Sequence, residues 1–147
     1  MKLVVDTNVV VSAMVRDSVT RRLLFHPALE LFSPPHLFEE LEEHKAEIMQ
    51  KSGFTEIEFS DFISALAKIV FMVSEEAYKK HMRDVAEVIA DPNDLQFAAS
   101  AIVVNSLSPC GIWSNDPHFT TREEEFFNRF GIKIWTTYKV YQLLKKP

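Results

Sequence analysis

The segment Lys2-Leu3-Val4-Val5-Asp6 decides the fold class. A short aliphatic, β-branched run that ends at a polar residue is typical of a strand buried on both faces of a parallel sheet. Residues 7–25, which follow it, are predicted to be largely helical. A buried strand followed by a helix starts a parallel crossover unit, and the rest of the chain continues this alternation.

Three further strands are predicted downstream, at residues 31–33, 111–114 and 132–135. Helices are predicted at residues 33–49, from 55, from 74, from 91, at 121–131 and at 138–146, and their N-terminal residues Ser33, Thr55, Ser74, Asp91 and Thr121 are cap formers. The helix from residue 55 is expected to include Val70, and the helix from residue 74 to continue to Ile89. We therefore expect one α/β domain over residues 1–147, a three-layer α/β/α sandwich with a central parallel sheet of four to five strands.

Composition supports a folded domain with a sizeable core. The chain has 147 residues, 47% of them hydrophobic, including 12 Phe. With 16 Lys+Arg against 21 Asp+Glu, the formal net charge is −5. This balance argues against holding nucleic acid by bulk positive charge, although a local basic groove remains compatible with it.

Several classes of site are excluded. Only 3 Gly are present, and no glycine-rich phosphate loop or dinucleotide fingerprint occurs. The five histidines lack zinc-site spacing, and Cys110, the single cysteine, has no catalytic motif around it. The first apolar run is too short for a signal peptide or a membrane span, so a cytoplasmic location without membrane association is predicted.

Four carboxylates are predicted to gather at one edge of the sheet. Asp6 ends the first strand and Asp116 follows a later one, while Asp94 lies in the first turn of a helix and Glu40 in the helix after the second strand. In parallel sheets, ligands bind beyond the carboxyl ends of the strands. Clustered carboxylates repel one another unless cations neutralise them, and Mg²⁺ or Mn²⁺ prefers such oxygen ligands. The pattern indicates a metal-dependent phosphodiesterase.

Each of these acids also has a local structural interpretation. Asp6 could cap the following helix, Asp94 could favour the helix dipole, and Asp116 could be a turn residue. Asp91 fits the N-cap so well that a structural role is preferred for it. Glu39 and Glu40 belong to an acidic run that resembles a solvated helix face, and which of the two is the ligand stays open. The prediction therefore depends on the joint placement of the acids.

Four segments resemble those of PIN domains, in the same order and with similar spacing. Residues 3–13 (LVVDTNVVVSA) resemble the first strand with its Asp-x-Asn, and residues 33–41 (SPPHLFEEL) the Ser-Pro helix start, where the acid maps onto Glu40. Residues 91–101 (DPNDLQFAASA) resemble the Asp-Pro-x-Asp helix, where the acid is Asp94. Residues 113–119 (WSNDPHF) resemble the strand that ends in Ser/Thr-x-Asp, where the acid is Asp116.

The resemblance, which runs from residue 2 to about 140, implies a Mg²⁺- or Mn²⁺-dependent ribonuclease. Such proteins are often toxins neutralised by an antitoxin protein, and often homodimers. Asp6, Glu40, Asp94 and Asp116 would hold one or two ions, with Asn8 and Ser114 as supporting hydrogen-bond partners. His118 lies where many members have a further acid, so the number of ions stays open.

The mechanism implied is attack on phosphorus by water that the metal makes more acidic, without a side-chain nucleophile. An RNA substrate would need basic contacts around the acidic pocket. The candidates are Arg16, Arg21, Arg22, Lys79, Lys80 and Arg83, for which a solvated helix face is the plainer interpretation.

Two other functions are weighed. A non-enzymatic RNA-binding module on the same fold would bind RNA without cleaving it. An aspartyl-phosphate phosphatase also begins with a strand-end Asp, but it needs a second Asp where this chain has Asn8.

Overall fold

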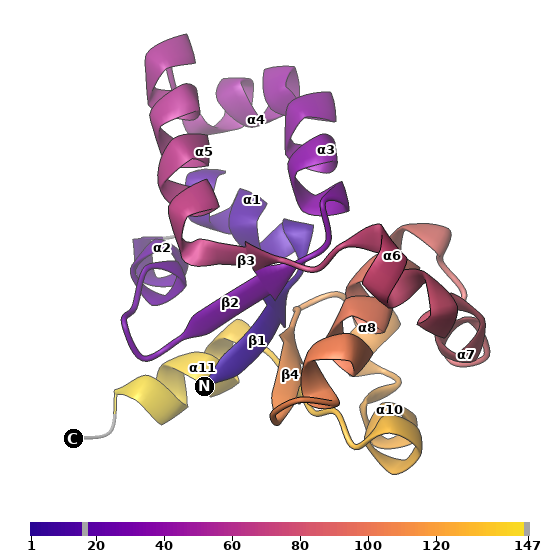
Figure 1. Ribbon diagram of the computed structural model, residues 1–147. Coiled ribbons are helices and arrows are strands. Elements are labelled where there is room, and N and C mark those ends of the chain that lie inside the picture. Colours follow the sequence, from indigo (N-terminus) through magenta and orange to yellow (C-terminus); the bar gives the residue numbers. More distant parts are fainter. Residues whose placement is uncertain (16–17, 146–147) are drawn as a thin grey trace.

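The computed structural model describes residues 1–15 and 18–145, which are built around a parallel sheet (Figure 1). The strands are β1 Lys2–Val5, β2 Glu30–Ser33, β3 Val70–Met72, β4 Cys110–Trp113 and β5 Ile134–Trp135. They form one five-stranded sheet in the order β3-β2-β1-β4-β5, and every neighbouring pair is parallel. The predicted α/β class with a parallel central sheet is confirmed.

Helices cover both faces of this sheet. They are α1 Thr7–Val15, α2 Ser18–Leu24, α3 His36–Glu43, α4 Lys45–Ser52, α5 Glu56–Ile69, α6 Glu75–Tyr78, the 3-10 helix η1 Lys79–His81, α7 Met82–Ala86, α8 Pro92–Asn105, α9 Pro117–Thr120, α10 Glu123–Phe130 and α11 Thr137–Leu144. Helix α8, with α6 and α7 packed on it, covers one face, and α1, α2 and α11 lie on the other (Figure 1). Helices α3, α4 and α5 extend beyond the carboxyl edge of the sheet.

Strand β3 was not predicted, and several predicted helix starts and spans are wrong. Val70 continues the apolar spacing of α5, yet it begins β3 and pairs with Leu31. The helix predicted at 33–49 breaks at His44 into α3 and α4. Ser33 does not cap it, because Ser33 is the last residue of β2 and its hydroxyl donates to the Pro34 carbonyl.

Two other predicted helices also differ, one in its continuity and the other in its first residue. The helix expected from Ser74 is capped there, but it divides into α6, η1 and α7 before residue 89. Thr121 does not cap α10, because its hydroxyl donates to the Pro117 carbonyl. The capping box of α5 and the Asp91 cap of α8 are confirmed.

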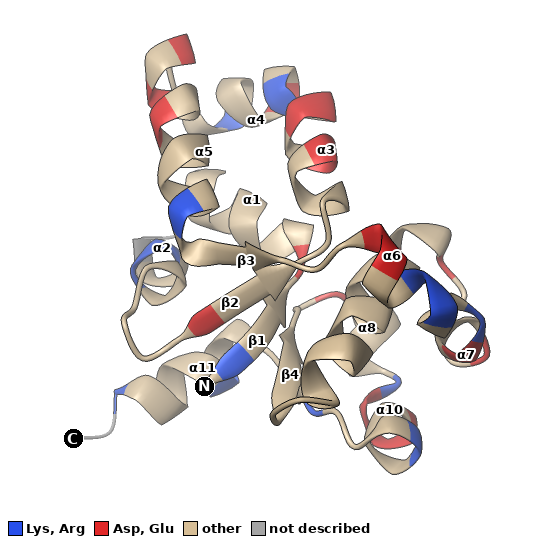
Figure 2. Ribbon diagram, in the orientation of Figure 1, with Lys and Arg blue, Asp and Glu red and all other residues tan. Residues whose placement is uncertain are grey.

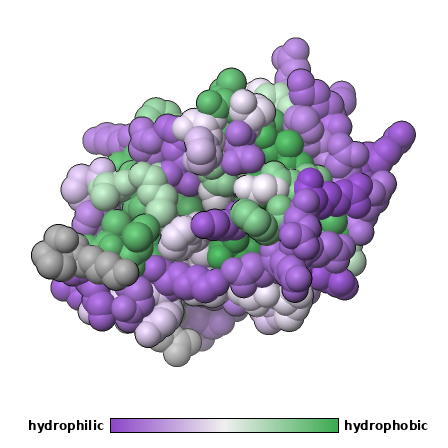
Figure 3. Space-filling view, turned by 90° about the horizontal axis from the view of Figure 1, so that it is seen from below, coloured by the Kyte–Doolittle hydropathy of each residue, from purple (hydrophilic) through white to green (hydrophobic). Residues whose placement is uncertain are grey.

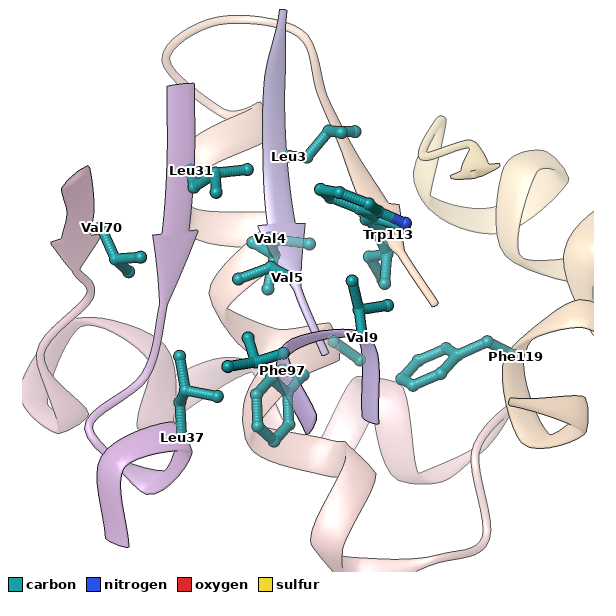
Figure 4. Close-up of a cluster of buried hydrophobic side chains, with 14 of the residues drawn as sticks. Leu3, Val4, Val5, Val9, Leu31, Leu37, Val70, Phe97, Trp113 and Phe119 are labelled. Atoms are coloured by element: carbon teal, nitrogen blue, oxygen red, sulfur yellow. The ribbon is translucent and has the colours of Figure 1, made fainter. Parts of the chain in front are cut away.

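The core fills both faces of the sheet, against α8 and α9 on one side and against α1, α2 and α11 on the other, and Figure 4 shows part of it. Val4, Val5, Trp113 and Phe119 are fully buried, and the Trp113 indole donates to the Thr137 hydroxyl at 3.0 Å. Burying one large apolar side chain contributes roughly 1.5–3 kcal/mol, so this packing holds the ends of β1 and β4 rigidly side by side.

The face seen from below in Figure 3 is mixed: hydrophobic patches are separated by hydrophilic side chains. Among the described residues, no helix is both long and apolar enough to span a bilayer.

Gly111 of β4 is required by the packing of β5. A Cβ at this position would lie 2.6 Å from Trp135 Cδ1 and 3.0 Å from the Lys133 carbonyl oxygen. We expect Gly111→Ala to lower the free energy of unfolding by about 1–3 kcal/mol, measured by urea denaturation. The loss should shrink when Trp135→Leu removes the clashing ring, and equal losses in both backgrounds would contradict this account.

Candidate functional site

The residues that follow β1 and β4 lie next to each other because these are neighbouring parallel strands. Val5 is paired with Trp113, so the next residues, Asp6 and Ser114, lie side by side. The Ser114 hydroxyl donates to Asp6 Oδ2 at 2.7 Å, and the Asp6 amide donates to the Trp113 carbonyl at 3.0 Å. Both Asp6 and Ser114 are buried. The sheet itself therefore fixes the position of the first carboxylate.

Asp116 is held by the turn between β4 and α9. Its amide donates to the Ser114 hydroxyl at 3.0 Å, and its Oδ1 accepts from the His118 amide at 2.8 Å, as the N-cap of α9. Its Oδ2 accepts from Asn8 Nδ2 at 3.2 Å. Ser114 thus links Asp116 to Asp6, and Asn8 orients Asp116, so both predicted supporting residues contact the acids.

Glu40 reaches the site through Thr7, the first residue of α1. The Thr7 hydroxyl donates to Glu40 Oε1 at 2.6 Å, and His36 Nε2 lies 3.7 Å from the same oxygen. The neighbouring Glu39 is exposed and faces the other nitrogen of His36 at 3.7 Å. Of the two glutamates, Glu40 is therefore the one placed beside the strand-end acids.

The start of α8 places two further acids, Asp91 and Asp94, beside His118. Asp94 is buried, and its Oδ2 lies 2.8 Å from His118 Nδ1. Asp91 caps α8 through Oδ1, and its Oδ2 lies 3.6 Å from His118 Nδ1. Asp91, Asp94 and His118 offer ligand atoms within 4.8 Å of one another.

Burial and mutual repulsion raise the pKa of the central carboxyl. Burial raises the pKa of Asp6 to about 7, and the charges of Asp94, Asp116 and Glu40 add to it, against the hydrogen bond from Ser114. The charges of the other three predicted acids thus all act on Asp6. Burial also raises the pKa of Asp94, while the bond to Asp94 and the charge of Asp116 raise the pKa of the His118 imidazole.

The four acids have no lysine or arginine partner among the described residues. Within residues 1–15 and 18–145, His36 and His118 are the only basic side chains that form ion-pair contacts with them. A set of partly buried carboxylates without such compensation favours a bound cation, and carboxylate oxygens suit hard divalent ions. The chemistry of this donor set thus fits a divalent cation that takes oxygen ligands, as the predicted Mg²⁺ or Mn²⁺ does.

A groove opens beside these acids. It has a volume of about 280 Å³ and is lined by residues of α1, α3 and α4, among them Asn8, Glu40, Glu47 and Lys51. Val11 lies along its wall. A flexible polymer bound at the acids would therefore find a neighbouring recess with both polar and apolar contacts.

The predicted basic residues separate into different groups. Lys79, Lys80 and Arg83 are exposed on η1 and α7, beside α8, where Figure 2 shows a blue segment between α6 and α7. Arg22 is exposed on α2, and Arg16 lies outside the described residues.

Arg21 has a structural role. Its guanidinium donates to the carbonyls of Ala13 and Met14, at 2.8 and 3.1 Å, and lies over the rings of Phe54 and Phe62. These contacts provide donors for two carbonyl groups in the last turn of α1 and connect α2 to the aromatic rings of Phe54 and α5.

Sequence reasoning missed three contributors to the site. Thr7 directly follows Asp6, which is the only signal for its role, and Asp91 was assigned to capping alone. For His118, two residues after Asp116, the sequence favours a surface loop histidine over one that tunes the site, yet the residue lies in α9 and its imidazole contacts Asp94.

A family model described as PIN domain matches residues 4–145 of the chain. This match covers nearly the whole chain and confirms the resemblance seen in the four motifs. No curated protein matches the chain.

Proposed function

This chain belongs to the PIN domain family, whose members are generally metal-dependent nucleases, and from that premise we propose that it is an endoribonuclease. Mg²⁺ or Mn²⁺ would be held by Asp6, Glu40, Asp94 and Asp116. The observation that carries the proposal is the gathering of these acids, without lysine or arginine partners among the described residues, at the carboxyl edge of the sheet. The toxin role, the antitoxin partner and the homodimer stay predictions from the resemblance.

A bound divalent ion supplies charge stabilisation at the phosphate and makes a coordinated water more acidic. The chain's own residues hold the acids in place for this. Ser114 fixes Asp6 and Asp116 together, Asn8 orients Asp116, and Thr7 orients Glu40. Because these contacts come from rigid strand ends and helix starts, the acids are positioned before a ligand arrives.

The surroundings of the acids suit a single-stranded substrate. The groove beside Glu40, of about 280 Å³, gives space for the nucleotide next to a bound phosphate, and it is lined by His44 and by Lys51, whose ammonium also pairs with Glu47. On the other side, Lys79, Lys80 and Arg83 offer phosphate contacts beside α8. The net charge of −5 includes the proposed metal ligands, so it does not argue against a local nucleic-acid path.

An end-labelled single-stranded RNA tests the proposal, with single-stranded DNA of the same sequence in parallel. We expect RNA fragments with Mg²⁺ or Mn²⁺ and none with a chelator. Equal cleavage of the DNA would overturn the choice of RNA. Binding without metal-dependent fragments would indicate the RNA-binding module instead, and release of inorganic phosphate would indicate the phosphatase.

A separate prediction concerns Ser114, whose hydroxyl contacts two of the proposed ligand residues, the Asp6 carboxylate and the Asp116 amide. We expect Ser114→Ala to weaken Mn²⁺ binding by about tenfold, measured by calorimetry, since Asp6 and Asp116 lose their shared partner. Ser106→Ala is the matched control, because Ser106 is the residue after α8 and its hydroxyl donates to the Val103 carbonyl of that helix. Unchanged affinity in a folded Ser114→Ala variant would contradict the positioning role.

A further inference from the structure

One imidazole nitrogen lies among three carboxylates at the rim of the site. His118 Nδ1 is 2.8 Å from Asp94 Oδ2, 3.3 Å from Asp116 Oδ1 and 3.6 Å from Asp91 Oδ2. The three acids come from two segments, the start of α8 and the turn before α9. The side chains thus converge on one nitrogen although their segments are far apart in the sequence.

The backbone keeps His118 in this position. Asp116 caps α9 by accepting from the His118 amide at 2.8 Å, which fixes the main chain of His118 beside the acids, and the imidazole itself is held by its contact with Asp94 Oδ2 at 2.8 Å. Asp91 uses Oδ1 to cap α8, at 2.9 Å from the Asn93 amide, which leaves Oδ2 directed toward the imidazole. The His118 side chain is 53% exposed, so an ion can approach it from solvent.

The spacing of these atoms suits ligands of one ion. Two neighbouring ligands at about 2.1 Å from an octahedral ion lie about 3 Å apart. Asp91, Asp94 and His118 offer ligand atoms that all lie within 4.8 Å of one another, and the imidazole nitrogen lies 3.6 and 2.8 Å from the two carboxylate oxygens, close to that value.

The imidazole changes which ion the site favours. Mg²⁺ takes oxygen ligands almost entirely, whereas first-row transition metals accept imidazole nitrogen readily. An acid in place of His118 would give the all-oxygen set that suits Mg²⁺. With His118 present, the donor set contains one nitrogen among several oxygens.

We propose that His118 is a nitrogen ligand of the metal site, with Asp94 and its neighbours Asp91 and Asp116, and that it makes the site prefer a first-row transition metal ion over Mg²⁺. This inference rests on the proposed metal-dependent function and deepens it by naming the class of ion. Mn²⁺ is the strictest probe, because it binds such ligands most weakly in the first-row series.

Direct binding of Mn²⁺ alone tests the proposal, without any substrate. Electron spin echo spectroscopy of the Mn²⁺ complex should show coupling to an imidazole nitrogen. The coupling should disappear in His118→Asp and persist in His81→Ala, a control in η1. By calorimetry, the preference for Mn²⁺ over Mg²⁺ should fall about tenfold in His118→Asp and stay unchanged in the control.

The outcomes separate this inference from the function on which it rests. Mn²⁺ binding with metal-dependent RNA cleavage but without nitrogen coupling would overturn the role of His118 and leave the nuclease proposal standing. An ion preference that His118→Asp does not change would also overturn it. Failure of the wild-type protein to bind either ion at millimolar concentration would overturn both proposals.

Discussion

Asp116→Asn should leave the protein folded and reduce metal-dependent RNA cleavage by at least about a hundredfold. Asparagine is as good an N-cap as aspartate, so it can still accept from the His118 amide and hold α9. What the variant loses is one negative charge among the four acids that would hold the ion. Loss of one preorganised electrostatic group commonly costs 10²–10³ in rate. The value to compare is kcat/KM on a single-stranded RNA at saturating metal.

The matched control is Asp84→Asn, an exposed acid on α7 that lies outside the proposed ligand set. It should keep full activity and the same thermal unfolding temperature. If a folded Asp116→Asn protein cleaved RNA as fast as the control, Asp116 would have no place in the proposed site.

The strand-end acids could be predicted from the sequence because parallel pairing alone brings them together. A run such as Leu3-Val4-Val5 identifies a buried strand, and every parallel strand delivers its next residue to the same edge. Asp6 and Asp116 therefore follow from local patterns. Their partner Ser114 follows as well, because it lies next to the end of β4.

The choice between Glu39 and Glu40 could be made only from the folded structure. Glu39 and Glu40 are adjacent in an acidic run, and helical phase alone does not decide which faces the sheet edge. The choice depends on Thr7, which is 33 residues from Glu40 in sequence and donates to it. That contact is set by the packing of α3 against α1, which no local pattern encodes.

Short elements and long-range contacts account for the other errors. Strand β3 has three residues, and Val70 also fits the apolar spacing of the helix before it. The role of Arg21 depends on carbonyls at the end of α1 and on two rings from the α5 region. A basic residue in a helix indicates a solvated face by default, and only tertiary contacts reveal the alternative.

Asp6→Asn should stabilise the metal-free protein at pH 8 by about 1–3 kcal/mol. The pKa of Asp6 is about 7 in the folded protein, against an ordinary value of 3.8, mainly because the carboxyl is buried. Charging it in the folded state at high pH therefore costs on the order of 4 kcal/mol. Asparagine avoids this cost and can still accept from Ser114, but its buried amide hydrogens lose part of the gain.

The raised pKa of Asp6 also fixes the direction in which the stability of the metal-free protein changes with pH. Between pH 3.8 and about 7 the folded protein keeps a proton on Asp6 that the unfolded chain has lost, so stability falls as pH rises through that window. The advantage of Asp6→Asn should therefore vanish by about pH 4, while Asp84→Asn should follow the wild type at every pH. Mn²⁺ at a hundred times its Kd should restore about 2.7 kcal/mol to the wild type at pH 8 and far less to Asp6→Asn. Urea denaturation of both proteins at pH 4 and pH 8 measures these differences. If, without metal, the wild type gained stability relative to Asp6→Asn as the pH rose, Asp6 would not be held in a repulsive cluster.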